Sequence, residues 1–137
     1  MDFKKYLFLI FTIVLFSCSQ KTLTINSSVK RIVYPGVVGL SPSVEYKISF
    51  ESSSDFKIDA VKLHTNEIKE FSLYDESTGK SISSAPVLKS GKYAISFKLE
   101  NSRDIEKPEE VTLFILSNNK LIQKKEKVKT IEPLRLR

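Results

Sequence analysis

The chain has very little of the residue types from which disulfides, metal sites and phosphate-binding loops are built. It holds one cysteine, one histidine and four glycines among 137 residues. A lone cysteine cannot form an internal disulfide, and one histidine without further ligands gives no metal-binding spacing. No glycine stands in the strand-to-helix context of a phosphate loop. These absences argue against a metal, a nucleotide or any other cofactor.

A long hydrophobic run is also missing. The longest apolar stretch, Tyr6 to Phe16, follows two lysines and is followed by Ser17 and Cys18. It is shorter than the about 20 apolar residues that a helix needs to cross a membrane. A basic start, a short apolar stretch and small residues are typical of a secretory signal peptide. Residues 1–17 are therefore interpreted as a leader that is removed on export.

The end of this leader carries a motif. Leu15, Phe16, Ser17 and Cys18 resemble the lipobox of bacterial lipoproteins, in which an aliphatic residue, a small or β-branched residue and Gly, Ala or Ser precede the cysteine. Phe16 departs from that pattern because it is bulkier than the usual second residue. The resemblance implies cleavage before Cys18, a diacylglyceryl group on its sulfur and an acylated amino group. Two or three acyl chains anchor a protein stably, since each buried methylene contributes about 0.8 kcal/mol.

Lipid would also explain why Cys18 has no partner, because an unpaired cysteine in an exported protein needs an explanation. The alternative is a buried thiol after an ordinary signal peptide. In the lipoprotein interpretation Ser19 takes the place of the Asp that keeps many such proteins on the inner membrane. This favours the outer membrane of a two-membrane cell. The small, polar residues 18–28 are expected to form a tether that keeps the domain close to the membrane.

The remaining length has room for one domain, which we place at residues 29–131, with 132–137 as a short basic tail. Its dominant signal is alternation between apolar and polar residues, which is typical of half-buried strands. The two clearest apolar series are Val44, Tyr46, Ile48, Phe50 and Tyr93, Ile95, Phe97, Leu99. Further strands are expected over Val29–Tyr34, Phe56–His64, Ile68–Tyr74, Lys80–Ser84, Val111–Leu116 and Leu121–Ile131. Short strands separated by turn residues predict an all-β fold with little helix, an antiparallel β-sandwich of about seven or eight strands.

One pattern makes the architecture more specific. Leu88, Gly91 and Tyr93 precede and begin a predicted strand as L-x-x-G-x-Y, which resembles the tyrosine corner of immunoglobulin-like β-sandwiches. In that motif the tyrosine hydroxyl bonds to backbone a few residues upstream. The resemblance implies an immunoglobulin-like sandwich and carries no activity with it. The alternative is a simple strand start with an inward tyrosine.

The net charge of +6 is concentrated after residue 119. The basic residues there are Lys120, Lys124, Lys125, Lys127, Lys129, Arg135 and Arg137. Such a stretch can attract phosphates or an acidic partner, so Lys124, Lys125, Lys127 and Lys129 are candidate contacts. The alternative is that lysines along an edge strand guard against aggregation. Nucleic acid is not expected, because no base-stacking aromatics accompany the lysines.

Catalytic signals are weak. His64 is expected at a strand end facing solvent, because nothing in the sequence places a nucleophile or carboxylate against it. The acidic pairs Asp75-Glu76 and Glu109-Glu110 contain the oxygen ligands that calcium takes. Both pairs fall at predicted turns or strand edges, where solvated carboxylates are the norm. A non-catalytic protein is expected.

Two functions remain open from the sequence. One is a membrane-anchored binding or scaffolding module that serves an envelope complex through a protein partner. The other is a periplasmic inhibitor or immunity protein that blocks an enzyme with a loop or strand edge. The loop between Pro35 and Ser43 is the candidate contact in the second case, with Val37, Val38 and Leu40 expected to be exposed between glycines.

Overall fold

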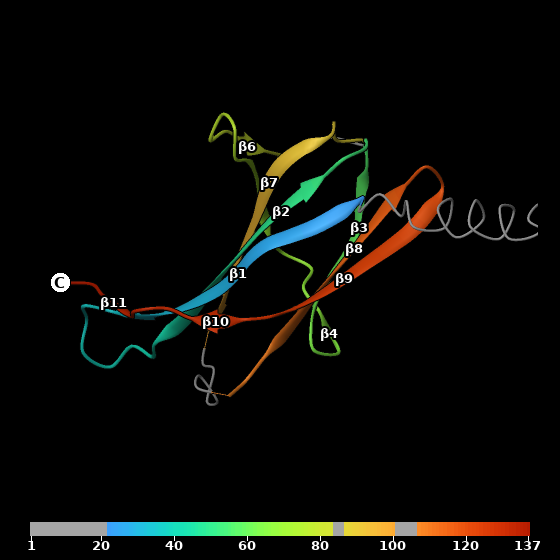
Figure 1. Ribbon diagram of the computed structural model, residues 1–137. Coiled ribbons are helices and arrows are strands. Elements are labelled where there is room, and N and C mark those ends of the chain that lie inside the picture. Colours follow the sequence, from blue (N-terminus) through green and yellow to red (C-terminus); the bar gives the residue numbers. More distant parts are fainter. Residues whose placement is uncertain (1–21, 84–86, 101–106) are drawn as a thin grey trace, which may run out of the picture.

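The computed structural model describes residues 22–83, 87–100 and 107–137 (Figure 1). Its strands are β1 (Leu23–Tyr34), β2 (Ser43–Ser52), β3 (Lys57–Leu63), β4 (Asn66–Glu67), β5 (Ser72–Asp75), β6 (Ser81–Ile82), β7 (Gly91–Glu100), β8 (Glu110–Ser117), β9 (Lys120–Lys127), β10 (Lys129–Thr130) and β11 (Leu134–Arg135). Within these ranges no helix is long and apolar enough to cross a membrane. The predicted leader and Cys18 lie outside the described residues.

The strands form two sheets. The larger has the order β10-β1-β2-β7-β5-β6, with β11 also paired to β1, and the smaller has the order β4-β3-β8-β9. Their apolar faces enclose one core that draws on both sheets. The predicted all-β sandwich is therefore confirmed. Ile68–Phe71, predicted as the first half of a strand, instead connects the smaller sheet to β5 in the larger one.

The two clearest alternating series supply the core of the larger sheet. Val44, Tyr46, Ile48 and Phe50 of β2 are all buried, and the Tyr93, Ile95 and Phe97 positions of β7 pair with them in register. Val61, Leu113 and Ile115 cover them from the smaller sheet. A period of two put these side chains on one face, and that face became the inside of the sandwich.

The first strand begins earlier than the sequence indicated. β1 starts at Leu23, which is fully buried, and pairs with β2 from Leu23 to Val33. The expected tether over 18–28 is thus wrong for residues 23–28. Polar residues on the outer side and a shift in register between Ile25 and Ser27 break the alternation there. Because the period of two is interrupted, the sequence pattern did not predict this part of the strand.

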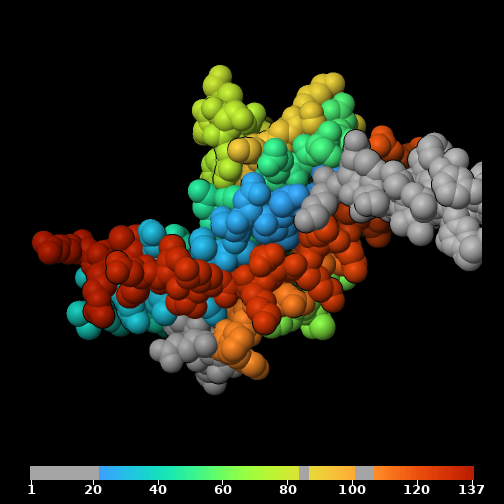
Figure 2. Space-filling view, in the orientation of Figure 1, coloured from blue at the N-terminus to red at the C-terminus, as the bar shows by residue number. Residues whose placement is uncertain are grey.

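The C-terminal region also differs from expectation. The single strand predicted over Leu121–Ile131 is divided: β9 belongs to the smaller sheet, whereas β10 pairs with β1 in the larger one. The predicted tail at 132–137 contains β11, which also pairs with β1. Both pairings are parallel, so the sandwich is not wholly antiparallel. The chain passes from β9 to β10 without reversing its direction. As a result, β10 and β11 run parallel to β1. The last segment lies along β1 in Figure 2.

The long β1 strand separates two ends of the molecule. The near end is where β1 begins: it holds Leu23, its partner Ser52 and the β8–β9 turn. The far end is where β1 ends: it holds the loop 35–42 and the C-terminal residues 134–137. With 12 residues in β1 and about 3.3 Å per residue, the two ends lie about 40 Å apart. Figure 1 shows the C-terminus and the β1–β2 loop together at one side of the molecule.

Candidate functional site

The loop that follows β1 is the most exposed apolar segment of the far end. Val37 and Leu40 are 65% and 62% exposed, and Val38 is fully exposed. Gly39 has a φ of 95°, a conformation that glycine adopts at little cost, and it turns the chain back toward β2. The predicted exposure of these three side chains is confirmed. Apolar side chains gathered at a loop tip are unfavourable in water unless a partner covers them.

The C-terminal segment supports this loop. The Leu136 amide donates a hydrogen bond to the Tyr34 carbonyl at 3.0 Å, and the Arg135 guanidinium lies 4.8 Å from the centre of the Tyr34 ring. A Cβ atom at Gly36 would lie only 3.0 to 3.2 Å from the backbone of Leu136 and Arg137. Only glycine fits there without moving the neighbouring chain. The C-terminus is thus part of the far-end surface.

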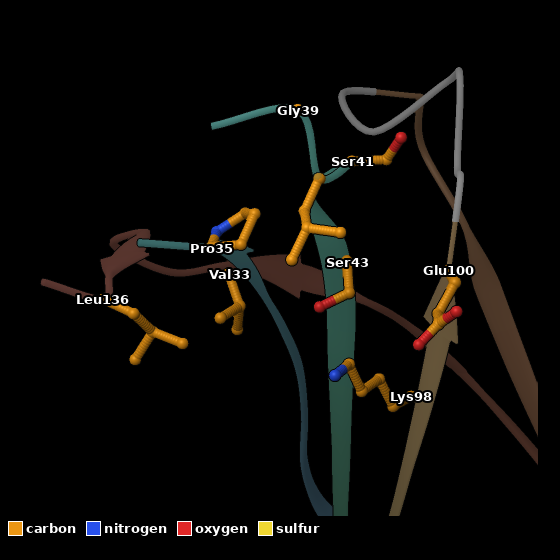
Figure 3. A pocket seen from close by; sticks show the side chains of 9 residues that line it. Val33, Pro35, Gly39, Ser41, Ser43, Lys98, Glu100 and Leu136 are labelled. Carbon is orange, nitrogen blue, oxygen red and sulfur yellow. The ribbon is translucent and has the colours of Figure 1, made fainter. Parts of the chain in front are cut away.

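A shallow hollow lies between the loop and the C-terminal segment (Figure 3). Val33, Pro35 and Leu136 form its apolar side, and Lys98 and Glu100 of β7 form its polar side. Leu136 is 52% exposed, so the hollow adds apolar area to the exposed loop. We call Val37, Val38, Leu40 and Leu136 the far-end patch.

The predicted lysine contacts do not form one surface. Lys125 and Lys127 are exposed on the outer side of β9, whereas Lys124 pairs with buried Leu113 and is half-buried. Lys129 lies in β10 of the other sheet. Alternation along the strand and the change of sheet divide a group that is continuous in sequence. This distribution fits the alternative of a protected edge strand.

A buried ionic group, which the sequence did not reveal, ties the two sheets together. The Lys30 ammonium lies 2.6 Å from Glu109 Oε1, and the side chains are only 2% and 10% exposed. Lys30 also donates to the Lys107 carbonyl at 3.0 Å. The Tyr46 hydroxyl donates to the Glu109 carboxylate, at 2.9 Å from each oxygen. Burial and, to a smaller extent, Glu109 raise the pKa of Tyr46 well above its ordinary value.

This group corrects one expectation. Glu109 was expected to be a solvated carboxylate, but it is largely buried and accepts from two side chains. Lys30 points inward because it follows the register shift in β1 and faces Tyr46 across the strand pair. The sequence does show a lysine within an apolar strand. Whether Lys30 points inward or outward depends on the register shift in β1, which the sequence does not show. With its charges paired and shielded from solvent, the group acts as a structural tie between β1, β2 and the start of β8.

The other titratable candidates have ordinary surroundings. His64 is exposed, as predicted, and has a φ of 54° in the β3–β4 turn. Asp75 accepts from the Ser77 amide at 2.8 Å, and Glu76 accepts from the Ser49 hydroxyl at 2.7 Å. No group of three or more His, Cys, Asp or Glu suited to a metal ion occurs among residues 22–83, 87–100 and 107–137. These acids stabilise turns and strands.

The near end is held by hydrogen bonds. The Tyr93 hydroxyl donates to the Lys89 carbonyl at 2.8 Å, which confirms the predicted tyrosine-corner bond, and burial raises the pKa of Tyr93. Ser117 donates to the Asp55 carbonyl at 2.9 Å, and its hydroxyl lies 2.6 Å from that of Ser54. The β8–β9 turn is therefore attached to the loop that follows β2.

No protein-family model, curated protein or solved structure matches this chain. Its function is therefore inferred from the arrangement of its own residues.

Proposed function

We propose that this chain is a bacterial lipoprotein whose β-sandwich binds a protein partner with the far-end patch, while lipid on Cys18 holds the near end at a membrane. The anchoring part of the proposal rests on the lipobox resemblance of Leu15 to Cys18. The binding part rests on the exposed apolar loop. In a two-membrane cell the absence of Asp after the cysteine favours the outer membrane. The tyrosine corner supports the likeness to immunoglobulin-like sandwiches.

The single observation that carries the proposal is the position of the patch relative to the start of the domain. Leu23 begins β1, and Val37, Val38 and Leu40 follow the end of the same strand. A lipid attached five residues before Leu23 would therefore hold the end of the domain that lies about 40 Å from the patch. A partner would then meet an apolar surface that points away from the membrane. Apolar side chains at the centre of such a surface supply most of the binding energy in protein complexes.

The proposal is non-catalytic. In the only buried ion pair found among the described residues, the Lys30 and Glu109 side chains are 2% and 10% exposed and bind each other. Asp75 and Glu76 accept hydrogen bonds from Ser77 and Ser49. A binding role requires none of them.

Site-specific photocrosslinking in living cells tests the binding role. A photoreactive residue replaces Val38 in the full chain, and a matched variant carries it at Thr78, which is exposed in the β5–β6 turn. We expect one recurrent envelope protein to be crosslinked at position 38 and not at position 78. Identical crosslinking from both positions, or none from position 38, would contradict the assignment of the patch.

A second candidate is an inhibitor of an envelope enzyme. The observation in its favour is the fully exposed Val38 at the tip of a loop between two glycines, a shape suited to insertion into a cleft. If the crosslinked partner is an enzyme, adding the purified lipoprotein should abolish its activity, and Val38→Asp should restore it. If the partner has no activity that the lipoprotein inhibits, the scaffolding role is favoured over the inhibitor role.

A further inference from the structure

A second group of exposed apolar side chains lies at the near end, on the outer face of the smaller sheet. Leu121 and Leu116 are 60% and 40% exposed and face each other across β9 and β8. Their strands are joined by Asn118 and Asn119, both with positive φ, as in the tight turns that connect antiparallel strands. The group therefore sits at the end of a rigid hairpin.

Val87 belongs to the same row. It is 60% exposed and immediately precedes Leu88, which bridges Phe56 in antiparallel fashion. In an antiparallel pair the residue before Leu88 falls opposite the residue after Phe56, so Val87 is placed beside Lys57. Lys57 pairs with Leu116. The row across the sheet is thus apolar at three of its four positions, with one cation within it.

Two cations lie within or beside this row. Lys57 is exposed within it, and the Lys89 side chain, which is 87% exposed, lies 3.5 Å from the Asp55 carboxylate. A second acid, Asp59, is exposed two residues after Lys57. Lys120 pairs with buried Ser117 and therefore lies on the other face of the hairpin. Exposed leucines beside lysines are the combination that binds at the boundary between acyl chains and phosphate headgroups, because the apolar groups enter the lipid while the cations meet the phosphates.

The chain length before the domain brings this row to the membrane. The Thr22 carbonyl already accepts a hydrogen bond from the Ser53 amide at 2.9 Å, so the fixed part of the domain starts there. Ser54, next in the chain, contacts Ser117 at the base of the hairpin. From Cys18 to Thr22 a fully extended chain spans at most about 14 Å. A lipid at Cys18 leaves the hairpin no room to remain far from the bilayer surface.

We propose that the near end is a membrane-docking surface, in which Val87, Leu116 and Leu121 enter the headgroup region and Lys57 and Lys89 bind lipid phosphates. This inference rests on the proposed lipid at Cys18. It adds that the domain is held in one orientation and does not swing on its anchor. The far-end patch then stands at a fixed height above the membrane, where a partner in the envelope can meet it.

The test uses the native lipoprotein in vesicles of phosphatidylethanolamine and phosphatidylglycerol. Since lipid occupies the sulfur of Cys18, Leu121→Cys provides a single free thiol for a polarity-sensitive fluorophore, and Val38→Cys is the matched control at the far end. Relative to the same protein in detergent, we expect a blue-shifted emission and a several-fold loss of quenching by aqueous iodide at position 121. Position 38 should show neither change.

A second variant tests the contribution of the lysines to docking without changing the core of the domain. Lys57→Gln with Lys89→Gln should restore most of the iodide quenching at position 121 in vesicles that contain phosphatidylglycerol. Equal quenching at positions 121 and 38 in vesicles that retain the protein through alkaline washing would overturn the docking surface while leaving the anchor intact. Protein that washes off the vesicles would instead overturn the anchor itself.

Discussion

The two ends of the sandwich are closed in different ways. At the near end one closing bond joins residues close in sequence, from Tyr93 to Lys89, and others, such as Ser117 to Asp55, join distant ones. At the far end the closing contacts join residues that are far apart in sequence, because the backbone of Leu136 lies against Tyr34 and Gly36. A contact between residues close in sequence costs less loop-closure entropy than a contact between distant residues. The far end thus closes only when the C-terminal segment is in place, whereas one closing bond of the near end forms within a single turn.

The largest effect is expected from breaking the buried ion pair. Glu109→Ala leaves the Tyr46 hydroxyl without its acceptor and the buried Lys30 ammonium without its counter-charge, with only the Lys107 carbonyl as partner. This should lower the free energy of unfolding by about 3 to 5 kcal/mol. Urea denaturation measures this change. Glu126→Gln, an exposed glutamate on β9, is the control and should differ from wild type by less than about 0.5 kcal/mol. A small loss for Glu109→Ala would show that the pair does not tie the sheets.

At the near end the corresponding change is Tyr93→Phe. The variant keeps the ring among Phe50 and Phe56 but leaves the Lys89 carbonyl without its donor. The expected loss is about 1 to 3 kcal/mol, again from urea denaturation. Tyr74→Phe, at an exposed tyrosine of β5, should cost almost nothing. Equal effects from the two variants would argue against a structural role for the corner bond.

Gly36→Ala tests the close contact between the loop and the C-terminal segment at the far end. The added methyl group meets the backbone of Leu136 and Arg137, and overpacking of this kind costs about 1 to 3 kcal/mol. Removing residues 134–137 should abolish the difference between glycine and alanine at position 36. If alanine remains costly in the truncated chain, the cost comes from elsewhere in the loop.

The smallest expected effect is a change in pH dependence. An unfolded tyrosine titrates near its ordinary pKa of 10.0, whereas burial and Glu109 raise the pKa of Tyr46 in the folded state. Above about pH 10 the unfolded chain loses a proton that the folded chain keeps, so the contribution of Tyr46 is complete below that pH and falls above it. Tyr46→Phe should flatten the alkaline loss of stability followed by urea denaturation. Glu126→Gln should keep the wild-type slope.

For the same physical reason, the sequence predicted features set by neighbouring residues better than features set by contacts between distant residues. Alternation in β2 and β7 and the spacing of Leu88, Gly91 and Tyr93 are local signals, and they predicted both core strands and the corner bond. The direction of Lys30 depends on a register shift in β1, and the burial of Glu109 depends on which sheet lies opposite. Neither can be deduced from nearby residues.

The candidate surfaces show the same contrast. Exposure of Val37, Val38 and Leu40 could be predicted from a loop bounded by glycines and prolines. The contribution of Leu136 could not, because the last residues looked like a free tail and pair with β1 only after the chain changes sheets. The charge of the lysine run was visible in sequence, whereas its division between two sheets arises from the fold.

The two ends have opposite roles only if lipid holds the near end at a membrane. Mass spectrometry of the protein isolated from its own cells decides this. We expect a chain that begins at Cys18 and carries the mass of a diacylglyceryl group, with a further acyl group on the amino terminus. A chain that still begins at Met1, or a cysteine with an unmodified thiol, would show that the near end is not anchored.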